Sequence, residues 1–553
     1  MGGAGTAARS EIERIARESL GIDALHPQQL EAIELVVAGG DVLAIWATGS
    51  GKTAIYQVAA AMRPGVTVVV SPLIALQEDQ RLRIEEAPRL DGAVVLNSAG
   101  GERVRQESWQ RLRDGDAQHV LLAPEQLAKP EVVEGLAELE VALLVVDEAH
   151  CIAAWGHDFR PDYLLLGSVA ERLGRPPIVA LTATASAPVR DEIVERLGIP
   201  EASVLVGDLD RPGIALSVVR HVDDDAKRAA VVDQVAALPT PGLLYASTRA
   251  GTQRYAEALA ERGLRSLVYH GGMAAKAREE VHRRFHEGDV DVVVATSAFG
   301  MGIDKPDVRF VVHADVPESI DAYFQEVGRA GRDGADATAT LHYRPEDLSL
   351  RRYFATKAPS RRELASIVSA VGRRPRSRRR LADETGVSPR RLTALLSLLV
   401  DTASVRMDRD GVRARTGVDA REAVSAALDR ARDRERIDES RIEMLRAYAE
   451  TRRCRRRTLL EYFGQELPEP CGECDRCRAG DDDADAARAA AGEAETSAGS
   501  SGRFDLEQQV THRSWGDGTV MSIEDDRMTV FFEHQGYKVL SLEAVEEQDL
   551  LTG

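Results

Sequence analysis

The sequence Ala47-Thr48-Gly49-Ser50-Gly51-Lys52-Thr53 decides the fold of the first part of this chain, because it joins an apolar run to a helical segment. A strand, a glycine-rich turn and a helix in this order form a phosphate-binding loop, with backbone amides facing the phosphates at a helix N-terminus. The Lys52 ammonium would contact the β and γ phosphates, and the Thr53 hydroxyl would bind Mg²⁺. Trp46 stands where the strict pattern has glycine, so the loop is a variant. An ordinary glycine-rich turn is the alternative, which the Lys-Thr pair disfavours. The predicted nucleotide-binding residues are Thr48, Gly49, Ser50, Gly51, Lys52 and Thr53.

A second chemical motif, Asp147-Glu148-Ala149-His150, ends the apolar run at 141–146. A carboxylate at the end of a strand can hold Mg²⁺, and Asp147 has that position. Glu148 would then orient or deprotonate an attacking water molecule. An ordinary acidic strand end is the alternative, but the phosphate-binding loop upstream favours the catalytic interpretation.

Short apolar runs alternate with helix-length segments over the first two-thirds of the chain. Such runs are typical of parallel strands that are buried on both faces of a sheet. The runs fall into two sets, separated near 207–225, and this predicts two α/β domains at 1–206 and 207–345. The predicted strands are 42–46, 66–70, 93–96, 120–122, 141–146 and 178–181 in the first set and 243–246, 267–269, 292–295 and 310–313 in the second.

Composition limits the class of protein. The chain has 553 residues with 71 basic and 90 acidic side chains, a formal net charge of −19. A purely electrostatic nucleic-acid coat protein is excluded because such proteins are basic overall. We find neither a signal-peptide pattern at 1–10 nor an apolar run long enough for a transmembrane helix, so we expect a cytoplasmic protein without a membrane partner.

The stretch from Asp147 to Tyr163, DEAHCIAAWGHDFRPDY, closely resembles motif II and the following aromatic-rich loop of the RecQ family, within helicase superfamily 2. The resemblance covers about residues 20–477. It implies two RecA-like domains and an ATP- and Mg²⁺-dependent DNA helicase that acts in repair or recombination, with 3′-to-5′ polarity. It also implies that the loop contacts DNA through Trp155, His157, Phe159 and Arg160. The alternative is an aromatic cluster packed beneath the loop.

Other segments resemble the family's motifs in order, and each implies a role for one or two residues. Ser71 and Thr296 belong to segments that would contact DNA, and Asp304 to one that would contact the nucleotide. Arg332, with Arg329 second, is the candidate arginine finger, which would neutralise charge on the transferred phosphate. Gln29 matches the glutamine that reads the adenine edge. Ile22 and His26 replace the usual aromatic residue and arginine, so we expect weaker stacking on the base.

Four of the five cysteines, Cys454, Cys471, Cys474 and Cys477, lie close together in the sequence. Four thiolates suit tetrahedral Zn²⁺, and in a cytosolic chain a metal is favoured over disulfides. The surrounding helical segment at 426–480 resembles the RecQ zinc module. We expect the metal to be structural and the remaining cysteine, Cys151, to be a core residue.

The segment 346–425 departs from the family, because RecQ proteins usually carry a winged helix after the zinc module. Here a helix-turn-helix pattern with a possible β wing precedes the cysteines, and the range 373–415 has twelve Arg against five Asp or Glu. This predicts a winged-helix-like basic module that contacts duplex DNA through Arg390 and Arg391. A helical spacer with a solvated arginine face is the alternative.

The C-terminal region divides into a linker and a small all-β unit. Residues 481–503 are Asp, Ala, Gly, Ser and Glu with little to bury, which predicts a disordered linker. Residues 504–553 have three strand signals and resemble the Tudor-like barrel of UvrD-type helicases. That resemblance implies a protein partner such as RNA polymerase, and a plain stabilising barrel is the alternative.

Several functions remain open on this evidence. An ATP-driven DNA translocase or remodeller that does not separate strands would fit the displaced winged segment. A non-catalytic DNA-binding scaffold is disfavoured by Lys52, Asp147, Glu148 and Arg332. An RNA helicase is disfavoured by the aromatic-rich stretch and the cysteines. A DNA motor would be cytoplasmic and associated with the nucleoid.

Overall fold

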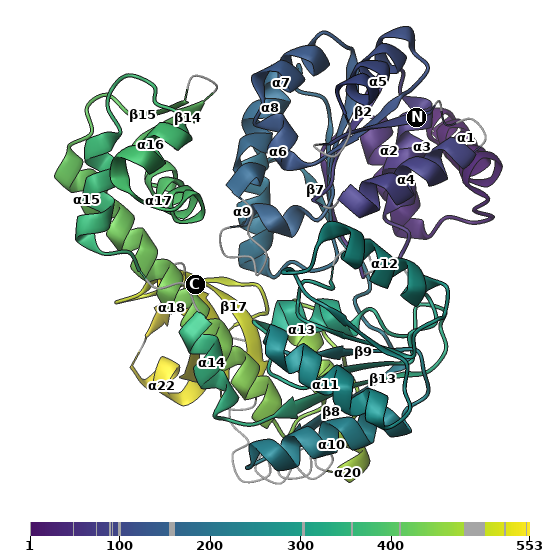
Figure 1. The fold of residues 1–553 in the computed structure, drawn as a ribbon, viewed down its shortest axis with the longest axis vertical. Helices are drawn as coiled ribbons and strands as arrows, with labels where there is room; N and C mark the ends of the chain where they lie inside the picture. Colours follow the sequence, from purple (N-terminus) through teal and green to yellow (C-terminus); the bar gives the residue numbers. More distant parts are fainter. Residues whose placement is uncertain are drawn as a thin grey trace.

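The computed structural model of the protein describes residues 2–47, 49–72, 74–87, 90, 92–97, 101–153, 161–300, 305–354, 358–408, 411–480, 504–524, 527–532, 534–548 and 550–552. Two parallel sheets, a helical arm and a C-terminal sheet follow one another along the chain (Figure 1). Both parallel sheets carry helices on their two faces, as in RecA-like domains.

The first domain has a seven-stranded parallel sheet of order β3-β4-β2-β5-β6-β1-β7. Alternate side chains of the central strands point into two different cores, which explains their continuous apolar sequence. Leu43 and Ile45 face the core that includes α7 to α9, whereas Val42 and Ala44 face the core that includes α1 to α3. The strands are β1 (Val42–Ile45), β2 (Val66–Val70), β3 (Ala93–Leu96), β4 (His119–Leu122), β5 (Val141–Val146), β6 (Ile178–Thr182) and β7 (Ser203–Val206). The helices are α1 (Gly2–Leu20), α2 (Pro27–Val37), α3 (Thr53–Met62), α4 (Ile74–Glu86), α5 (Glu102–Asp114), α6 (Pro124–Leu127), α7 (Pro130–Ala137), η1 (Ala149–Ile152), η2 (Pro161–Leu165), α8 (Leu166–Arg172) and α9 (Ala187–Leu197).

The second domain has a six-stranded parallel sheet of order β10-β11-β9-β12-β13-β8. One face packs on α10 and α11, and the other packs on α12 and α13 in a core that continues into the zinc-binding region. The strands are β8 (Ile214–Arg220), β9 (Gly242–Tyr245), β10 (Ser266–Tyr269), β11 (Val292–Ala295), β12 (Phe310–His313) and β13 (Ala337–Tyr343). The helices are α10 (Asp224–Ala237), α11 (Arg249–Glu261), α12 (Ala275–His286) and α13 (Ile320–Val327).

In the two parallel-sheet domains every apolar run that we predicted as a strand is a strand, but three of their described strands, β7, β8 and β13, escaped prediction. The edge strands β7 and β8 are half-exposed, so they lack a continuous apolar run. β13 begins with alternating Ala and Thr, so it has no continuous apolar run to predict it, although it is almost entirely buried. β8 also lies inside the stretch at 207–225 that we took as a gap between the two sets of strands.

The helical arm contains the winged-helix-like module and the zinc-binding region. Three short helices and a two-stranded antiparallel hairpin form the module, around a separate core of leucines and valines. The 31-residue helix α18 runs from this module down to the second domain (Figure 1). The module has α15 (Arg361–Ala370), α16 (Arg378–Thr385), α17 (Pro389–Asp401), β14 (Val405–Asp408) and β15 (Gly411–Ala414), and the region around it has α14 (Asp347–Phe354), α18 (Ala420–Glu450), α19 (Arg455–Tyr462) and α20 (Asp475–Ala479).

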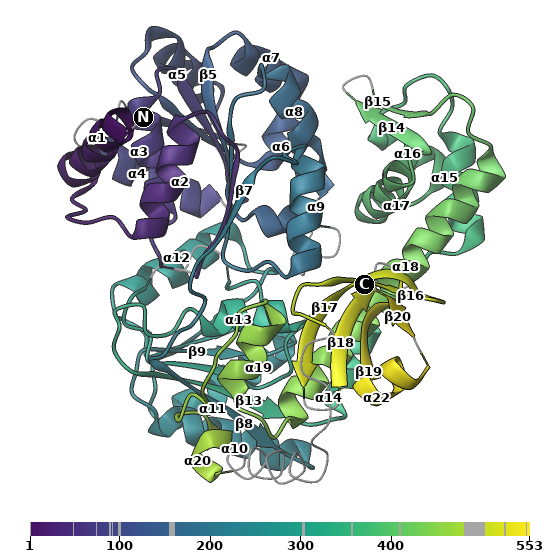
Figure 2. The same cartoon turned by 180° about the vertical axis from the view of Figure 1, so that it is seen from behind.

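The C-terminal region is an antiparallel sheet of five strands, of order β19-β18-β17-β16-β20, with one short helix. Figure 2 shows it packed beside α18 and α19, beneath α9 of the first domain. Its elements are β16 (Gln509–His512), β17 (Gly516–Glu524), β18 (Arg527–Phe532), β19 (Gly536–Ser541), α22 (Leu542–Glu547) and β20 (Leu551–Thr552). The expected linker at 481–503 lies outside the described residues.

No helix among the described residues is both long enough and apolar enough to cross a membrane.

Candidate functional site

The phosphate-binding loop connects β1 to α3 and is shaped by two glycines. Gly49 and Gly51 have φ angles of 84° and 76°, a left-handed conformation that favours glycine. A Cβ on Gly51 would lie 2.7 Å from Nε2 of Gln29, so a larger residue would displace that side chain. Lys52 folds back on the loop and donates to the carbonyl oxygens of Trp46 at 2.7 Å and Ala47 at 3.2 Å.

Gln29 links the N-terminal segment to this loop. Its Nε2 donates to the carbonyl oxygens of Ser50 and Gly51, at 3.0 and 3.3 Å, while its Oε1 accepts from the His26 amide at 2.8 Å. The residue that we predicted to read adenine therefore also braces the loop that would hold the phosphates. Thr53 begins α3, with its side chain half-buried beside Lys52.

The acidic motif follows β5 directly, as the sequence predicted. Asp147 is held from two sides, because Ser71 Oγ donates to its carboxylate at 3.4 Å and Tyr163 donates to its carbonyl oxygen at 3.0 Å. Glu148 has a φ of 49°, an uncommon angle for a residue other than glycine. Strained backbone of this kind is often found at functional sites.

His150 connects the acidic motif to β6. Its Nδ1 lies 3.3 Å from the carboxylate of Glu148 and 2.9 Å from the hydroxyl of Thr182. The Thr182 hydroxyl in turn donates to the carbonyl oxygen of Thr184 at 3.0 Å. The sequence contains His150 in the DEAH motif, but its contact with Thr182 depends on the pairing of β5 with β6.

Burial and neighbouring charges set different proton affinities for the three ionisable groups of the site. Burial, with the charge of Glu148, raises the pKa of Asp147 to about 6. Burial alone would raise the pKa of Glu148, but the hydrogen bond and charge of His150, with the charges of Lys52 and Arg329, lower it to about 2. Burial also lowers the pKa of Lys52. Glu148 is therefore a firmly ionised carboxylate at neutral pH.

Two arginines of the second domain face this site. A Cβ on Gly49 would lie 3.8 Å from the Cγ and Cδ atoms of Arg332, so Arg332 packs against the phosphate-binding loop across the domain boundary. Arg329 is 3% exposed, and its positive charge acts on Glu148. Both arginines directly follow α13. The site is therefore lined by residues of both domains.

Some predicted residues lie outside the described part of the structure. These are Thr48, Asp304, the aromatic-rich loop with Trp155, His157, Phe159 and Arg160, and the side chain of Arg390.

Three predicted DNA contacts can be located. Thr296 follows β11 and is half-buried at the end of its strand. Ser71 is fully buried, so in this structure it positions Asp147 instead of facing a ligand. Arg391 makes a bidentate ion pair with Glu363, at 2.8 and 2.9 Å, so its guanidinium joins α17 to α15 within the module. The contacts of Ser71 and Arg391 could not be predicted from the sequence, because their partners are distant along the chain.

The four predicted zinc ligands converge. Their Sγ atoms all lie within 4.8 Å of one another, and none of the four forms a disulfide. Backbone amides donate to the sulfurs, from Cys471 to Cys454 at 3.3 Å and from Cys474 to Cys471 at 3.4 Å. This donor set fits a tetrahedral Zn²⁺ ion.

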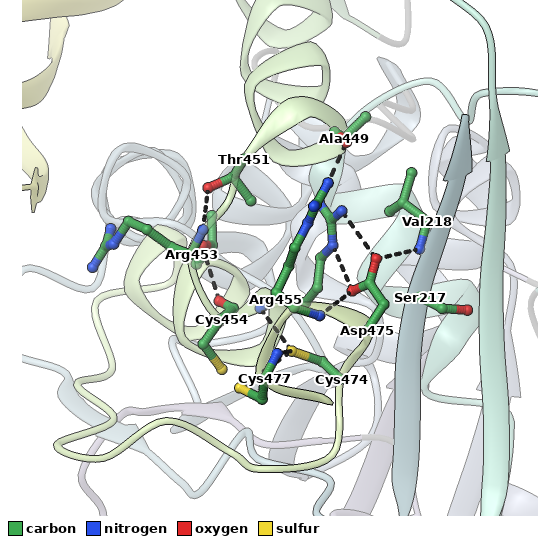
Figure 3. A network of polar contacts seen from close by, with 12 residues as sticks. Ser217, Val218, Ala449, Thr451, Arg453, Cys454, Arg455, Cys474, Asp475 and Cys477 are labelled. Atoms are coloured by element: carbon green, nitrogen blue, oxygen red, sulfur yellow. Dashed lines mark hydrogen bonds and ion pairs between the residues drawn. The ribbon is translucent and has the colours of Figure 1, made fainter. Parts of the chain in front are cut away.

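A polar network ties the cysteine cluster to the second domain (Figure 3). Arg455 is fully buried and pairs with Asp475 through bonds of 3.0 and 3.2 Å. The Asp475 carboxylate also accepts from the Val218 amide in β8, at 3.2 Å. The cluster therefore fixes the unpaired edge of the second sheet, which no sequence motif indicated.

The C-terminal sheet is docked on the helicase domains. The hydroxyls of Tyr462 and Tyr537 lie 3.0 Å apart, and Tyr462 also donates to Asp321 of α13 at 2.8 Å. Arg190 of α9 reaches Glu507 at 2.7 Å. The sheet thus contacts α9 of the first domain and α19 of the zinc-binding region, and α19 in turn bonds to the second domain.

Comparison with known proteins gives four family matches along the chain. Residues 26–192 match the DEAD/DEAH box helicase family, and residues 227–334 match the helicase conserved C-terminal domain. Residues 409–478 match the RecQ zinc-binding family, and residues 507–548 match a protein family of unknown function, DUF3553.

Two curated relatives are similar over most of the chain. The probable ATP-dependent DNA helicase RecS of Bacillus subtilis is 35% identical over 68% of this chain and 75% of the relative. The ATP-dependent DNA helicase RecQ of Pasteurella multocida is 32% identical over 83% of this chain, which spans only 60% of that relative.

Among solved structures, the helicase Lhr of Mycobacterium smegmatis, bound to single-stranded DNA and AMP-PNP, has a similar fold. The TM-score is 0.51 with 23% identity, over 77% of this chain and 62% of that one.

Proposed function

This chain belongs to the RecQ family of ATP-dependent DNA helicases, and on that basis we propose that it hydrolyses ATP to separate or remodel DNA strands. The observation that carries the proposal is the contact of Arg332 with the phosphate-binding loop at Gly49. A nucleotide in that loop would touch both domains, so its hydrolysis can change the angle between them.

Each side chain of the site has a distinct task in this proposal. Lys52 and Arg332 hold the phosphates from opposite sides, and Arg329 reinforces the positive charge. Thr53 and Asp147 would hold Mg²⁺, which would neutralise phosphate charge when bound. Glu148 orients the attacking water, and its low pKa keeps it ionised. His150 restrains Glu148 and links it to Thr182, so the state of the site can reach β6.

DNA binding is proposed along the ends of the strands of both domains. The aromatic-rich loop would supply stacking faces and a cation through Trp155 and Arg160, and Thr296 would contact the backbone from the second domain. In this proposal the Ser71 side chain does not contact DNA, and only the backbone next to it would do so. We propose 3′-to-5′ polarity and a role in repair or recombination, in line with the family.

The test is strand displacement on 3′-tailed, 5′-tailed and blunt duplexes, with the Lys52→Ala variant as the matched control. Separation of the 3′-tailed substrate alone, lost in Lys52→Ala, is the expected result. ATP hydrolysis stimulated by DNA without separation of any substrate would instead favour a translocase. Unaltered hydrolysis in Lys52→Ala would overturn the assignment of the site.

We propose a structural role for zinc and a nucleoid-associated location, which follows from DNA binding.

The partner of the C-terminal sheet is a separate proposal. A protein such as RNA polymerase could bind its remaining surface, which includes Val539, 55% exposed. The contacts of this sheet with Arg190 and Tyr462 favour the stabilising alternative. Binding of purified RNA polymerase to the full chain, lost in a Val539→Glu variant, would decide between them.

A further inference from the structure

A short linker joins the two parallel-sheet domains and is held in a fixed conformation. It covers residues 207–213, between β7 and β8. Leu209 is fully buried within it. The Arg211 amide donates to the carboxylate of Asp210 at 2.7 Å, and the Ile214 amide donates to the Arg211 carbonyl oxygen at 3.0 Å. The backbone of Arg211 therefore has a defined place between the domains.

The side chain of Arg211 extends from this linker to the segment that carries both candidate finger arginines. We call residues 328–332 the finger segment. The Arg211 guanidinium donates to three of its backbone carbonyl oxygens, at 3.1 Å to Gly328, 2.8 Å to Ala330 and 3.1 Å to Gly331. A guanidinium is a rigid planar fork, so it can hold several acceptors in one fixed arrangement. These acceptors lie on both sides of Arg329 and directly before Arg332.

The finger segment needs such bonds because it lies beyond the end of α13. Helix α13 ends at Val327, so the carbonyl groups that follow are outside its hydrogen-bond ladder and need other donors. A cation near the C-terminal end of a helix is also favoured by the helix dipole. Gly331 has a φ of 56°, and a Cβ there would lie 2.8 Å from the carbonyl oxygen of Ala335, so the segment makes a tight turn. Its shape therefore depends on contacts with other parts of the chain.

The finger segment stands close to the phosphate-binding loop. Arg332 packs against Gly49 of that loop. Arg211 lines a cavity at the domain boundary that is also lined by Ala47 and Gly328. A catalytic group acts only within a narrow range of positions, and misplacement by about 1 Å can cost roughly a hundredfold in rate. The bonds from Arg211 can therefore decide whether Arg332 reaches the phosphates.

A third module, the zinc-binding region, also holds the linker. The Gln465 side chain accepts from the Leu209 amide and donates to Asp208, both at 2.9 Å. Arg456 of α19 lies 3.3 Å from the carboxylate of Asp210. These contacts keep the linker in place, so that it can serve as a fixed support for the finger segment.

We propose that Arg211 is a positioning residue for ATP hydrolysis, which holds the finger segment so that Arg332 faces the nucleotide. This rests on the proposed function, because an arginine finger matters only if ATP is hydrolysed between the domains. Arg211 acts through the backbone of the finger segment and through Arg332. Since Arg211 belongs to the linker, the angle between the domains and the placement of the finger would change together.

The kinetic test uses the full-length protein, steady-state ATP hydrolysis with single-stranded DNA, and the Kd of a fluorescent ATP analogue. Arg211→Ala should lower kcat roughly a hundredfold, the cost of a misplaced catalytic group. The nucleotide Kd should change by less than about twofold, because Lys52 and the loop amides remain. Arg220→Ala, which removes an exposed arginine at the end of β8, is the matched control and should change neither quantity.

The double variant Arg211→Ala/Arg332→Ala separates positioning from a general structural role. If Arg211 acts through Arg332, the double variant should be slower than Arg332→Ala by less than about tenfold. Two independent effects would multiply, and the double variant would then lose roughly a further hundredfold. That outcome would overturn the proposal.

Hydrogen exchange without nucleotide tests the placement of the finger segment directly. The amides of Ala330 and Gly331 donate to the carbonyl oxygens of Val327 and Val308, at 3.0 and 2.9 Å. Both amides should exchange roughly tenfold faster in Arg211→Ala and at the wild-type rate in Arg220→Ala.

Two further results would overturn the proposal: a normal kcat in Arg211→Ala, or wild-type exchange at positions 330 and 331 in that variant. Hydrolysis that is present in the wild type and lost in Lys52→Ala would leave the proposed function intact in both cases. If instead the wild type hydrolyses no ATP, the proposed function fails, and the exchange result alone decides whether Arg211 holds the finger segment.

Discussion

Arg190 of α9 donates a hydrogen bond of 2.7 Å to the carboxylate of Glu507, which lies 317 positions later at the start of the C-terminal sheet. The same guanidinium donates to the carbonyl oxygens of Ala185 at 3.0 Å and Phe463 at 2.6 Å. One side chain therefore joins the first domain, the zinc-binding region and the C-terminal sheet. Glu507 has a φ of 63°, so its backbone is held in an uncommon conformation at this junction. The C-terminal sheet is therefore packed directly on the first domain and the zinc-binding region.

Replacing Glu507 with Gln should loosen the C-terminal sheet without unfolding the helicase domains. The lost charge is half-exposed, so we expect a cost of about 1 kcal/mol, between that of a surface pair and a buried one. Hydrogen exchange of the amides in β16 to β18 should accelerate roughly fivefold. Glu543→Gln, at an exposed position of α22, is the control, and equal exchange in the two variants would contradict the role of Glu507.

Replacing Arg332 with Ala should slow ATP hydrolysis by roughly 10³–10⁵, the range for a lost arginine finger. Binding of ATP should change far less, because Lys52 and the loop amides remain. Steady-state kcat and the Kd of a fluorescent nucleotide separate the two effects. Arg283→Ala, which removes an exposed arginine of α12, should change neither quantity. A normal kcat in Arg332→Ala would show that Arg332 takes no part in ATP hydrolysis.

Replacing Cys474 with Ser should release the metal and free the edge of the second sheet. Asp475 begins α20 next to the cluster, so loss of the metal should break its bond with the Val218 amide, which would then exchange faster. Zinc content and hydrogen exchange measure the two steps. Asp475→Ala, which removes the acceptor, should keep the zinc and still expose Val218. If the Val218 amide exchanged at the wild-type rate in both variants, the hydrogen bond between Asp475 and Val218 would not be what holds the edge of the second sheet.

Acidification should destabilise the first domain through His119 of β4. Burial lowers the pKa of this fully buried imidazole to about 4. Between its unfolded pKa of about 6.5 and about pH 4, His119 is protonated in the unfolded chain but stays neutral in the folded domain. Stability is therefore fully present above about pH 6.5 and is lost as the pH falls through that window. At about pH 5 the loss should be about 2 kcal/mol.

The check is to compare denaturant midpoints at about pH 7.5 and about pH 5 in wild type and in His119→Gln. His119→Gln should be less stable at the higher pH but should lose less on acidification. His286→Gln, at an exposed position, should keep the wild-type pH dependence. Parallel curves for wild type and His119→Gln would contradict the assignment.

Local patterns in the sequence predicted most of the residues that the structure brings together in the candidate site. Gly49, Lys52 and Asp147 are recognised because a strand followed by a turn imposes its own residue types over a few positions. The cysteine spacing likewise predicted the sulfur cluster. Strands at the sheet edges were missed, since β7 and β8 bury too little surface to leave a continuous apolar pattern.

The role of individual polar residues was harder to predict. Ser71 and Arg391 are predicted to contact DNA, and the sequence did not show that their side chains also bond to Asp147 and Glu363. A serine or arginine has the same appearance in the sequence whether it faces solvent or a distant carboxylate. Only the pairing of β2 with β5, and the packing of α15 on α17, brings these carboxylates within reach.

The sequence by itself determined the chemistry of this protein: a phosphate-binding loop, an acidic strand end, paired arginines and four thiols. Each of these depends on residue types close together in the chain. The tertiary structure decided how they work together, because Arg332 meets Gly49, Asp475 meets Val218 and Glu507 meets Arg190 only after separate modules have docked. Contacts of this kind come from burial of surfaces between modules, and no local pattern encodes them.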